Sequence, residues 1–231
     1  MDFRDRHVII TGGTGALGSA VVAALLERGA TCHIPWMNES EAQRFLHRSH
    51  ERARLAKVSD LADEAAVNQF YRGVSALWGS IHIAGGFATS PVAETNKAAL
   101  MAQLEMNLVT CFLCCSAAVR AMKGMGGRIV NVTARAALEP RLSAGMAAYA
   151  ASKAGIVALT QALAQEVAAD GIWVNAVAPS IMDTPANRQA MPKADHALWP
   201  KPAEVAATIL FLASPENAVT RGAVVPVYGK S

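Results

Sequence analysis

Two residues on one expected helix have side chains suited to moving a proton. Tyr149 and Lys153 lie four residues apart in an alanine-rich, helix-period segment, so they share one helical face. A free phenol titrates near pH ~10, and it acts as an acid or base at neutral pH only when its pKa is lowered. We expect the field of the Lys153 ammonium to lower the pKa of Tyr149. The alternative is an ordinary half-buried Tyr beside a surface Lys.

A glycine-rich stretch near the start of the chain is suited to binding a dinucleotide. The stretch Thr11-Gly12-Gly13-Thr14-Gly15-Ala16-Leu17-Gly18 follows an apolar run at 7–10 and precedes a helix-period segment at 20–26. In such a turn, the unpaired N–H groups and the positive end of the helix face the anionic pyrophosphate. A tight turn without a ligand is the alternative, and the strand before it and the helix after it favour the dinucleotide site.

Each glycine of this stretch has an expected role. Without Cβ atoms, Gly12 and Gly13 can take positive φ and turn the chain sharply, and Gly15 lets the backbone approach the pyrophosphate. Gly18 would let the helix pack closely on the sheet. The cofactor contacts expected from this stretch come from Gly12, Thr14, Gly15, Ala16 and Leu17.

Strand-like and helix-like segments alternate through the chain, which predicts parallel strands joined by right-handed crossovers. Strands are expected at 7–10, 31–34, 53–58, 81–84, 127–133, 172–177 and 223–227, and the longest helices at 97–122, 146–170 and 202–213. Pro35 cannot donate to a strand ladder, so pairing of the second strand should stop there. The predicted fold class is α/β, a Rossmann-type doubly wound parallel seven-stranded sheet in a single domain.

The residues that follow each strand should meet at one edge of the sheet and complete the dinucleotide site. Trp36 is expected on the adenine. Asn38, Glu39 or Ser40 is expected on the ribose, and because no Asp or Arg stands there, NAD and NADP both stay open. Asp60 is a candidate for the adenine amino group, although a loop aspartate is commonly just a cap. Further contacts at this edge are expected from Met37, Leu61, Ala84, Gly85, Gly86, Pro179, Ser180 and Ile181.

Asn107 stands among apolar residues in the long helix expected at 97–122. Asn is a poor helix former and is costly to bury unpaired, so it is expected either to bond a neighbouring backbone or to have a role in the site. From Leu100 to Met122 this helix is apolar around most of its circumference. Packing one face of a helix against a sheet would bury only part of this apolar surface. The excess indicates contact with another subunit.

Composition and charge exclude several other classes of protein. The formal net charge is only +3, and the basic region at 44–54 is broken by an acidic residue and histidines, so no nucleic-acid binding is expected. No uninterrupted apolar stretch approaches the length of a membrane span, and the charged residues 1–6 leave no room for an apolar signal segment. The four cysteines fit reduced thiols, and Cys111, Cys114 and Cys115 indicate helix packing rather than a metal site. We therefore expect a cytoplasmic protein without a metal.

In order and across nearly the whole chain, the motifs resemble those of the short-chain dehydrogenase/reductases. The matches are Thr11-Gly12 with Gly18, Ala84-Gly85, Asn107, Tyr149-x-x-x-Lys153 and Asn175-Ala176-Val177-Ala178-Pro179. The resemblance implies a Rossmann domain that binds NAD or NADP, a small-molecule substrate, and a homo-oligomer, either a tetramer or a dimer. It implies that the nicotinamide moves a hydride while Tyr149 moves the proton. It also implies that Lys153 bonds the nicotinamide ribose and that Asn107 holds a water that relays protons.

The chain departs from the family pattern at the third catalytic position. A Ser is usual there, and Thr133-Ala134 stands in its place, so the position that should polarise the substrate oxygen has no hydroxyl. Thr133 or Ser143 is a candidate substitute. Alternatively, the reaction does not need this donor, because the dihydropteridine reductase branch also has Ala there and reduces a quinonoid C=N system. The segment 133–138 looks like that branch.

Two further departures concern the ends of strands. His82 stands where the family has an Asn that ties adjacent strands together, and a structural role is expected for it. Pro179-Ser180 replaces the usual Pro-Gly, which leaves Ile181 positioned to meet the nicotinamide carboxamide through its backbone.

The leading hypothesis is an oxidoreductase that transfers a hydride between NAD(P)(H) and a small carbonyl or alcohol, with Tyr149 as proton donor or acceptor. The first alternative is a pteridine-type or other C=N reductase, favoured by Ala134. The second is a dinucleotide-binding scaffold or redox sensor with weakened catalysis, favoured by the missing Ser. Retention of Tyr149 and Lys153 counts against the second, because a pure binder does not need a perturbed phenol.

Overall fold

The computed structural model describes all 231 residues and contains one seven-stranded sheet. All its strands are parallel, in the order β3-β2-β1-β4-β5-β6-β7. The predicted doubly wound Rossmann-type sheet in a single domain is therefore confirmed. The strands are β1 His7–Thr11, β2 Thr31–Trp36, β3 Ala53–Lys57, β4 Leu77–His82, β5 Gly127–Val132, β6 Ile172–Pro179 and β7 Val224–Val227.

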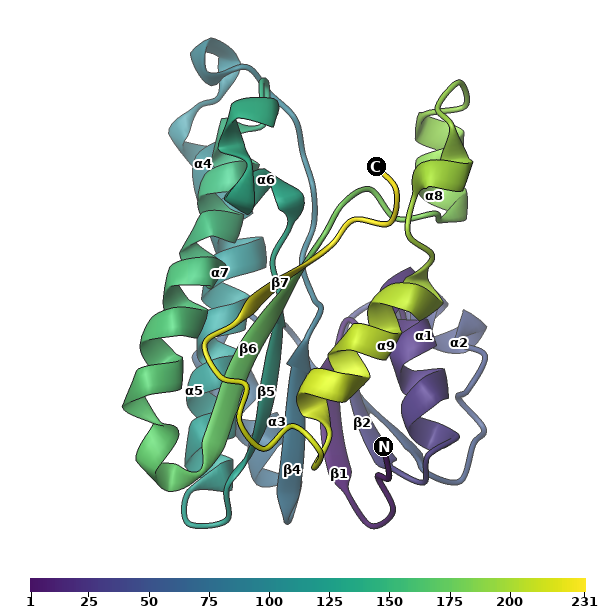
Figure 1. The fold of residues 1–231 in the computed structure, drawn as a ribbon, viewed down its shortest axis with the longest axis vertical. Helices are drawn as coiled ribbons and strands as arrows, with labels where there is room; N and C mark the ends of the chain where they lie inside the picture. The colour runs from purple at the N-terminus through teal and green to yellow at the C-terminus, as the bar shows by residue number, and fades with distance from the viewer.

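Helices cover both faces of this sheet (Figure 1). One apolar cluster joins α1 and α9 to one face, and a second joins α3, α5 and α7 to the other. The helices are α1 Ala16–Leu26, α2 Glu39–Arg44, α3 Glu64–Arg72, α4 Lys97–Gln103, α5 Thr110–Met122, α6 Arg135–Leu138, α7 Ala147–Glu166, α8 Pro185–Ala190 and α9 Pro202–Ala213.

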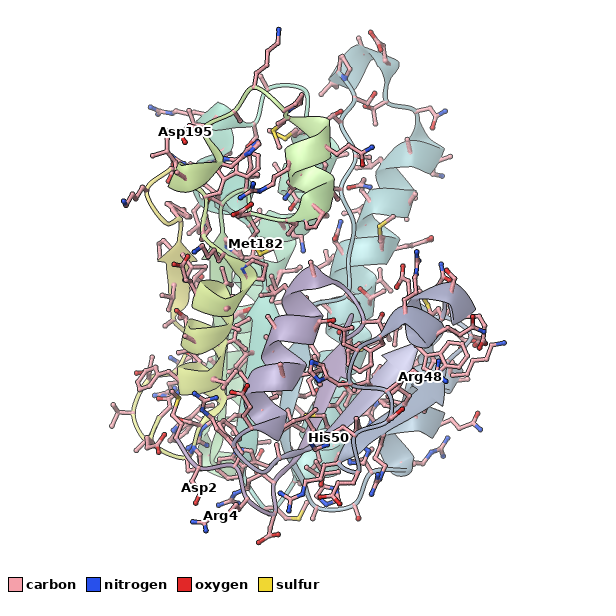
Figure 2. The ribbon with its side chains drawn as sticks, turned by 90° about the vertical axis from the view of Figure 1, so that its right-hand side faces the viewer. Asp2, Arg4, Arg48, His50, Met182 and Asp195 are labelled. Atoms are coloured by element: carbon pink, nitrogen blue, oxygen red, sulfur yellow. The ribbon has the colours of Figure 1, made fainter.

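The strand order reverses between β1 and β4, which pair directly. The chain leaves β1 toward α1 on one face and leaves β4 toward α5 on the other, so a crevice opens beyond the carboxyl ends of these two strands. Met182 and Asp195 lie toward this end of the molecule, whereas Asp2, Arg4 and His50 lie toward the opposite end (Figure 2). The predicted cofactor residues that follow β1, β2, β4 and β6 lie at these same carboxyl ends, the edge where this fold class binds ligands.

The glycine turn after β1 is closely packed. Gly12 has φ +67°, and a Cβ there would lie 2.8 Å from Ala84 N, so this glycine is required by conformation and by space. A Cβ on Gly18 would lie 2.0 Å from Gly12 O. Gly18 therefore allows close packing of the helix, as predicted, but the helix packs against the glycine turn itself rather than against the sheet. The positive φ predicted for Gly13 is wrong: this glycine is needed because a Cβ would meet Ile34 Cγ2 at 2.8 Å.

Among the strand boundaries that differ from those predicted, the end of β2 and the start of β4 have clear local causes. β2 continues through Pro35 to Trp36, because pairing with β1 ends at the Ile9–His33 pair while pairing with β3 continues. Pro35 has no N–H to donate, but no donor is needed toward β1, because β1 no longer pairs with β2 at this position. β4 begins four residues earlier than expected, at Leu77, where Gly79 and polar residues had weakened the apolar strand pattern.

The long helix predicted at 97–122 is confirmed as a continuous helical segment, but its middle part, Leu104–Val109, is a π-helix. By length and mean hydropathy (1.5) alone, the helical segment Lys97–Met122 could cross a membrane, although Gln103, Glu105 and Asn107 interrupt its apolar sequence. One such helix is weak evidence for a membrane span. Here α5 packs Cys111, Cys115 and Ala118 against the sheet.

We predict that Gly18→Ala destabilises the fold by about 3 kcal/mol, because the new methyl group overlaps backbone that cannot move without unmaking the turn. Urea unfolding monitored by circular dichroism measures the loss. The matched control is Gly15→Ala, where φ is −77° and the Cβ would be 3.4 Å from Gly12 O, so little change is expected. Equal stabilities of the two variants would contradict the packing argument.

Candidate active site

Tyr149 and Lys153 lie in the first two turns of α7 at the carboxyl end of β5. Lys153 is buried, and its Nζ donates to Val132 O at 3.1 Å, so the ammonium is held at the end of the strand. Burial lowers the pKa of Lys153 to about 8 and raises the pKa of Tyr149 to about 12. The expectation that Lys153 lowers the pKa of Tyr149 is therefore not met: removal from water dominates for the phenol.

Asn107 brings the long helix and the end of β4 together. Its Nδ2 donates to Gly86 O at 3.1 Å and its Oδ1 accepts from Gly86 N at 3.1 Å. A Cβ on Gly85 would lie 2.5 Å from Asn107 Oδ1 and 3.4 Å from Lys153 Nζ. The predicted bond to a neighbouring backbone is therefore confirmed, and Asn107 Oδ1 and Lys153 Nζ both lie next to Gly85.

Thr133 is close to Lys153, but its hydroxyl already donates a hydrogen bond within the protein. Thr133 Oγ1 donates to Lys153 O at 2.7 Å, and Ser143 Oγ faces Ala136 O at 3.4 Å. Thr133 and Ser143 are the two candidates for the hydroxyl that the family resemblance leads us to expect and that Ala134 lacks. At both positions the hydroxyl faces a backbone carbonyl. Thr133 instead fixes α7 against the end of β5, because both partners of its bond are buried.

The turn after β1 has the properties of a pyrophosphate cradle. The N-cap of α1, Gly15, has no side-chain cap, and the first turn carries no acidic residue, so no side chain neutralises the N–H groups of Ala16 and Leu17. Since a Cβ at Gly12 or Gly18 would fill this turn, the residues present fit an anionic dinucleotide. One contact was not foreseen: Thr14 Oγ1 donates to Glu41 Oε2 on α2 at 3.2 Å.

The expected adenosine residues lie where β2 and β3 end. Trp36 ends β2, and Lys57 Nζ is 5.6 Å from the centre of its ring. Met37 is exposed and Leu61 is buried. Asp60 Oδ1 accepts from Ala62 N at 2.8 Å, so this carboxylate already closes a turn, and its role toward adenine stays a prediction.

The expected nicotinamide end lies where β6 finishes. Pro179 is the last residue of the strand, and Ile181 is exposed. Ser180 Oγ donates to Tyr228 O at 2.9 Å and meets Ser231 Oγ at 2.8 Å, so the C-terminal segment lies against this side of the crevice. No pattern in the sequence predicts that contact.

Comparison with known proteins shows to which family the chain belongs. The family model described as short chain dehydrogenase matches residues 6–195. The chain belongs to the short-chain dehydrogenase family. It is 34% identical to a cis-4-hydroxycyclohexanecarboxylate dehydrogenase of Sinomonas cyclohexanicum, covering 98% of this chain and 96% of the relative. It is 32% identical to a galactitol 2-dehydrogenase of Rhizobium johnstonii, and this match covers 96% of this chain and 93% of the relative. The chain is accordingly an enzyme of the dehydrogenase/reductase class.

The fold comparison extends over the full length. A short-chain type dehydrogenase/reductase of Mycobacterium ulcerans has a TM-score of 0.90 at 24% identity, covering 100% of this chain and 90% of the other. At this level of identity the match demonstrates a shared fold.

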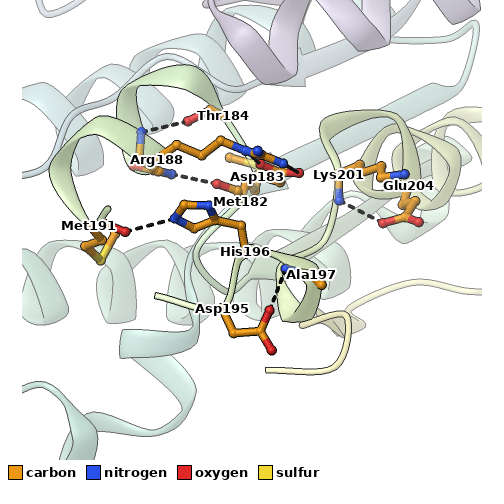
Figure 3. Close-up of polar contacts among 11 residues, drawn as sticks. Met182, Asp183, Thr184, Arg188, Met191, Asp195, His196, Ala197, Lys201 and Glu204 are labelled. Carbon is orange, nitrogen blue, oxygen red and sulfur yellow. Dashed lines mark hydrogen bonds and ion pairs between the residues drawn. The ribbon is translucent and has the colours of Figure 1, made fainter. Parts of the chain in front are cut away.

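Above the crevice of this short-chain dehydrogenase, the segment after β6 is braced by its own polar contacts (Figure 3). Asp183 and Arg188 form an ion pair, His196 Nε2 contacts Met191 O at 2.9 Å, and Glu204 Oε2 accepts from Lys201 N at 2.7 Å. These bonds are local, and the backbone bond from Lys230 N to Leu198 O at 2.9 Å ties the segment to the C-terminal part of the chain. Loops of this kind commonly carry specificity for the ligand.

His82 ties the centre of the sheet together, as predicted. Its Nδ1 contacts Asn131 Oδ1 on β5 at 2.8 Å, and its Nε2 contacts Ser80 Oγ at 2.8 Å. The ligand atoms of His82, Cys111 and Cys115 lie within 4.8 Å of one another, a spacing that suits a metal ion. However, hydrogen bonds within the protein already engage both ring nitrogens of His82, so this cluster serves packing.

We predict that wild-type protein gains stability relative to Lys153→Met as the pH rises from 7.5 to 9.5. Below about pH 8, Lys153 is charged in both states, so the folded state bears the full cost of burying the ammonium. Between its folded pKa of about 8 and the unfolded value of 10.5, the folded state is neutral and this cost is relieved, by up to about 1.4 kcal/mol per pH unit. Urea unfolding at several pH values measures the difference.

The control for this experiment is Lys193→Met, which removes an exposed ammonium. Its stability should follow the wild-type curve throughout. Parallel curves for wild type and Lys153→Met would show that burial does not depress the pKa of Lys153.

Proposed function

We propose that this enzyme transfers a hydride between NAD(P)(H) and a small carbonyl or alcohol substrate, with Tyr149 as the proton donor or acceptor. The observation that carries the proposal is the convergence of Gly85, Asn107 and Lys153 beside the uncapped glycine turn. The bound nicotinamide supplies or accepts the hydride. Among the relatives, a galactitol dehydrogenase and a hydroxycyclohexanecarboxylate dehydrogenase support an alcohol or carbonyl substrate.

The protein's own groups have divided roles in this proposal. A Tyr149 phenol whose pKa is about 12 is protonated at neutral pH and is ready to donate to an alkoxide, which favours carbonyl reduction. Lys153 binds the nicotinamide ribose and holds positive charge beside the phenol, and Asn107 positions a relay water. The remaining contacts are those expected from the sequence, with Gly12, Thr14, Gly15, Ala16 and Leu17 on the pyrophosphate, Trp36, Met37, Asp60 and Leu61 on adenosine, and Ala84, Gly85, Gly86, Pro179, Ser180 and Ile181 toward the nicotinamide.

A second candidate is a pteridine-type or other C=N reductase. Ala134 provides no hydroxyl, and those of Thr133 and Ser143 face backbone carbonyls. A substrate that needs no hydroxyl donor on its reacting atom suits this site. The third candidate, a weakened scaffold or redox sensor, is disfavoured because the buried Lys153 costs stability that pure binding does not require.

We predict that Tyr149→Phe lowers turnover at least about 100-fold and leaves dinucleotide binding within about twofold, because only the proton-transfer group is removed. Reduction of a panel of ketones, aldehydes and quinonoid dihydropterin by NADH and NADPH is followed at the nicotinamide absorbance. Preference for a ketone or aldehyde supports the leading proposal, and strict preference for the dihydropterin supports the second. Unchanged turnover in Tyr149→Phe would remove this residue from the mechanism.

The proposal includes a homo-oligomer, a tetramer or a dimer, in the cytoplasm. The helical segment 97–122 exposes four large apolar side chains, those of Leu100, Met101, Met106 and Phe112. A second copy of the chain would remove them from water. All four cysteines are free, which suits a reducing compartment.

Analytical ultracentrifugation at micromolar concentration should show a dimer or tetramer for the wild type and a monomer for Phe112→Arg, because the new charge would be buried unpaired in the interface. Val219→Arg changes a side chain that is exposed elsewhere and should leave the assembly intact. A monomeric wild type would refute the proposed assembly.

A further inference from the structure

A cavity of about 380 Å³ lies between the edge strand β3 and helix α3, away from the proposed active site. α3 packs beside α5, which covers β4, so the outer strands are left partly uncovered on this face. Cys32 and Ile34 of β2 belong to the apolar cluster on the α1 face, and His33 between them therefore faces the cavity. Phe70 and Val74 of the α3 region form its apolar wall. The cavity has the size of a site for a small organic molecule.

The polar groups that line this cavity are mostly hydrogen-bond donors, and no Asp or Glu is among them. The Arg54 guanidinium donates through Nη1 to Glu51 O and has its other N–H groups free. The exposed side chains of Ser59 and Gln69 make no hydrogen bond within the chain. Lys57 adds a second positive charge, with its Nζ over the Trp36 ring. Free donors and positive charge beside an apolar wall suit an anion that has an apolar body.

A pair of stacked histidines can add a further donor to the cavity without carrying charge. The His7 and His33 rings have their centres 5.1 Å apart, and His33 Nε2 lies 3.1 Å from His7 Nδ1. Burial, together with the positive charges of His7 and Arg54, lowers the pKa of His33 to about 4, so this ring is neutral at pH 7. When His7 Nδ1 donates to His33 Nε2, the proton of the neutral His33 ring is on Nδ1, which no other group of the chain engages. This arrangement supplies an N–H donor next to Arg54, which is the partner of His33 in the β2–β3 register.

We infer that this cavity binds an organic anion, with its carboxylate or phosphate at Arg54 and His33 and its apolar body against Phe70 and Val74. The inference goes beyond the proposed function and does not depend on it, because the cavity and α1 with its glycine turn lie on opposite faces of the sheet. The anion also offsets the mutual repulsion of the positive charges that line the cavity. A hollow that holds only water is the alternative, and the experiment distinguishes the two.

The experiment is calorimetric titration of benzoate, phenyl phosphate, inorganic phosphate and benzyl alcohol into the wild type and three variants. Arg54→Met removes the positive charge at an exposed position of the edge strand. Ala66→Trp fills the cavity from α3 and keeps every charge. The matched control is Arg48→Met: Arg48 is also exposed and also donates to a backbone carbonyl, Gln43 O at 3.1 Å, but it does not line the cavity. Circular dichroism verifies the folding of each variant.

We expect the wild type to bind benzoate or phenyl phosphate at least about tenfold more tightly than inorganic phosphate or benzyl alcohol, because only the first two use both the donors and the apolar wall. Arg54→Met and Ala66→Trp should each weaken this binding at least about tenfold, whereas Arg48→Met should change it by less than about twofold. The stronger of the two aromatic anions identifies the anionic group that the cavity takes, a carboxylate or a phosphate.

Nuclear magnetic resonance locates the bound anion independently. Its titration should shift the amide resonances of residues 54–59 and 66–74 and leave those of the glycine turn at 12–18 in place. Absence of binding by both aromatic anions, equal binding of inorganic phosphate or benzyl alcohol, or binding that persists in Arg54→Met overturns the inference. Each of these results leaves the proposed function standing, because that function is tested by turnover and by dinucleotide binding.

Discussion

The two hydrogen bonds between the Asn107 carboxamide and the Gly86 backbone are the constraint on which the site depends. They join a helix side chain to the segment that follows β4, 21 residues earlier in the chain. Because the amide satisfies both the N–H and the C=O of Gly86, that segment needs no strand neighbour to remain ordered. Gly85 then lies against Asn107 and Lys153, and a side chain there would overlap the Asn107 carboxamide, since its Cβ would lie 2.5 Å from Asn107 Oδ1.

The π-helix at Leu104–Val109 follows from the same constraint. A regular helix bonds each N–H to the carbonyl four residues earlier, whereas Asn107 Nδ2 also donates to Gln103 O at 3.2 Å and competes for that acceptor. The wider turn directs the Asn107 side chain at β4 while α5 continues along the sheet. A local departure from ideal geometry at a functional residue is thus supported by the surrounding packing.

The sequence predicted the parts of this molecule that depend on local patterns. Alternating strand and helix signals predicted the sheet and its seven strands, and the spacing of Tyr149 and Lys153 predicted that both lie on one face of a helix, α7. What it missed depends on distant partners. Strand pairing through Pro35 depends on where β1 ends, the role of the Thr133 hydroxyl depends on Lys153 O, and the contact of Thr14 with Glu41 depends on how α2 folds back. None of these leaves a periodic signal in the chain.

Burial shifts the pKa values of Tyr149 and Lys153 in opposite directions, and the proposed proton transfer depends on both shifts. Removing a phenol from water penalises the phenolate, and removing an ammonium from water penalises the cation. The pKa of Tyr149 near 12 and that of Lys153 near 8 are thus two results of one cause. The bond from Lys153 Nζ to Val132 O offsets part of the cost of the ammonium. Near neutral pH, a protonated phenol and a largely charged lysine therefore lie on the same helical face, which is the arrangement that the proposed proton transfer to an oxyanion requires.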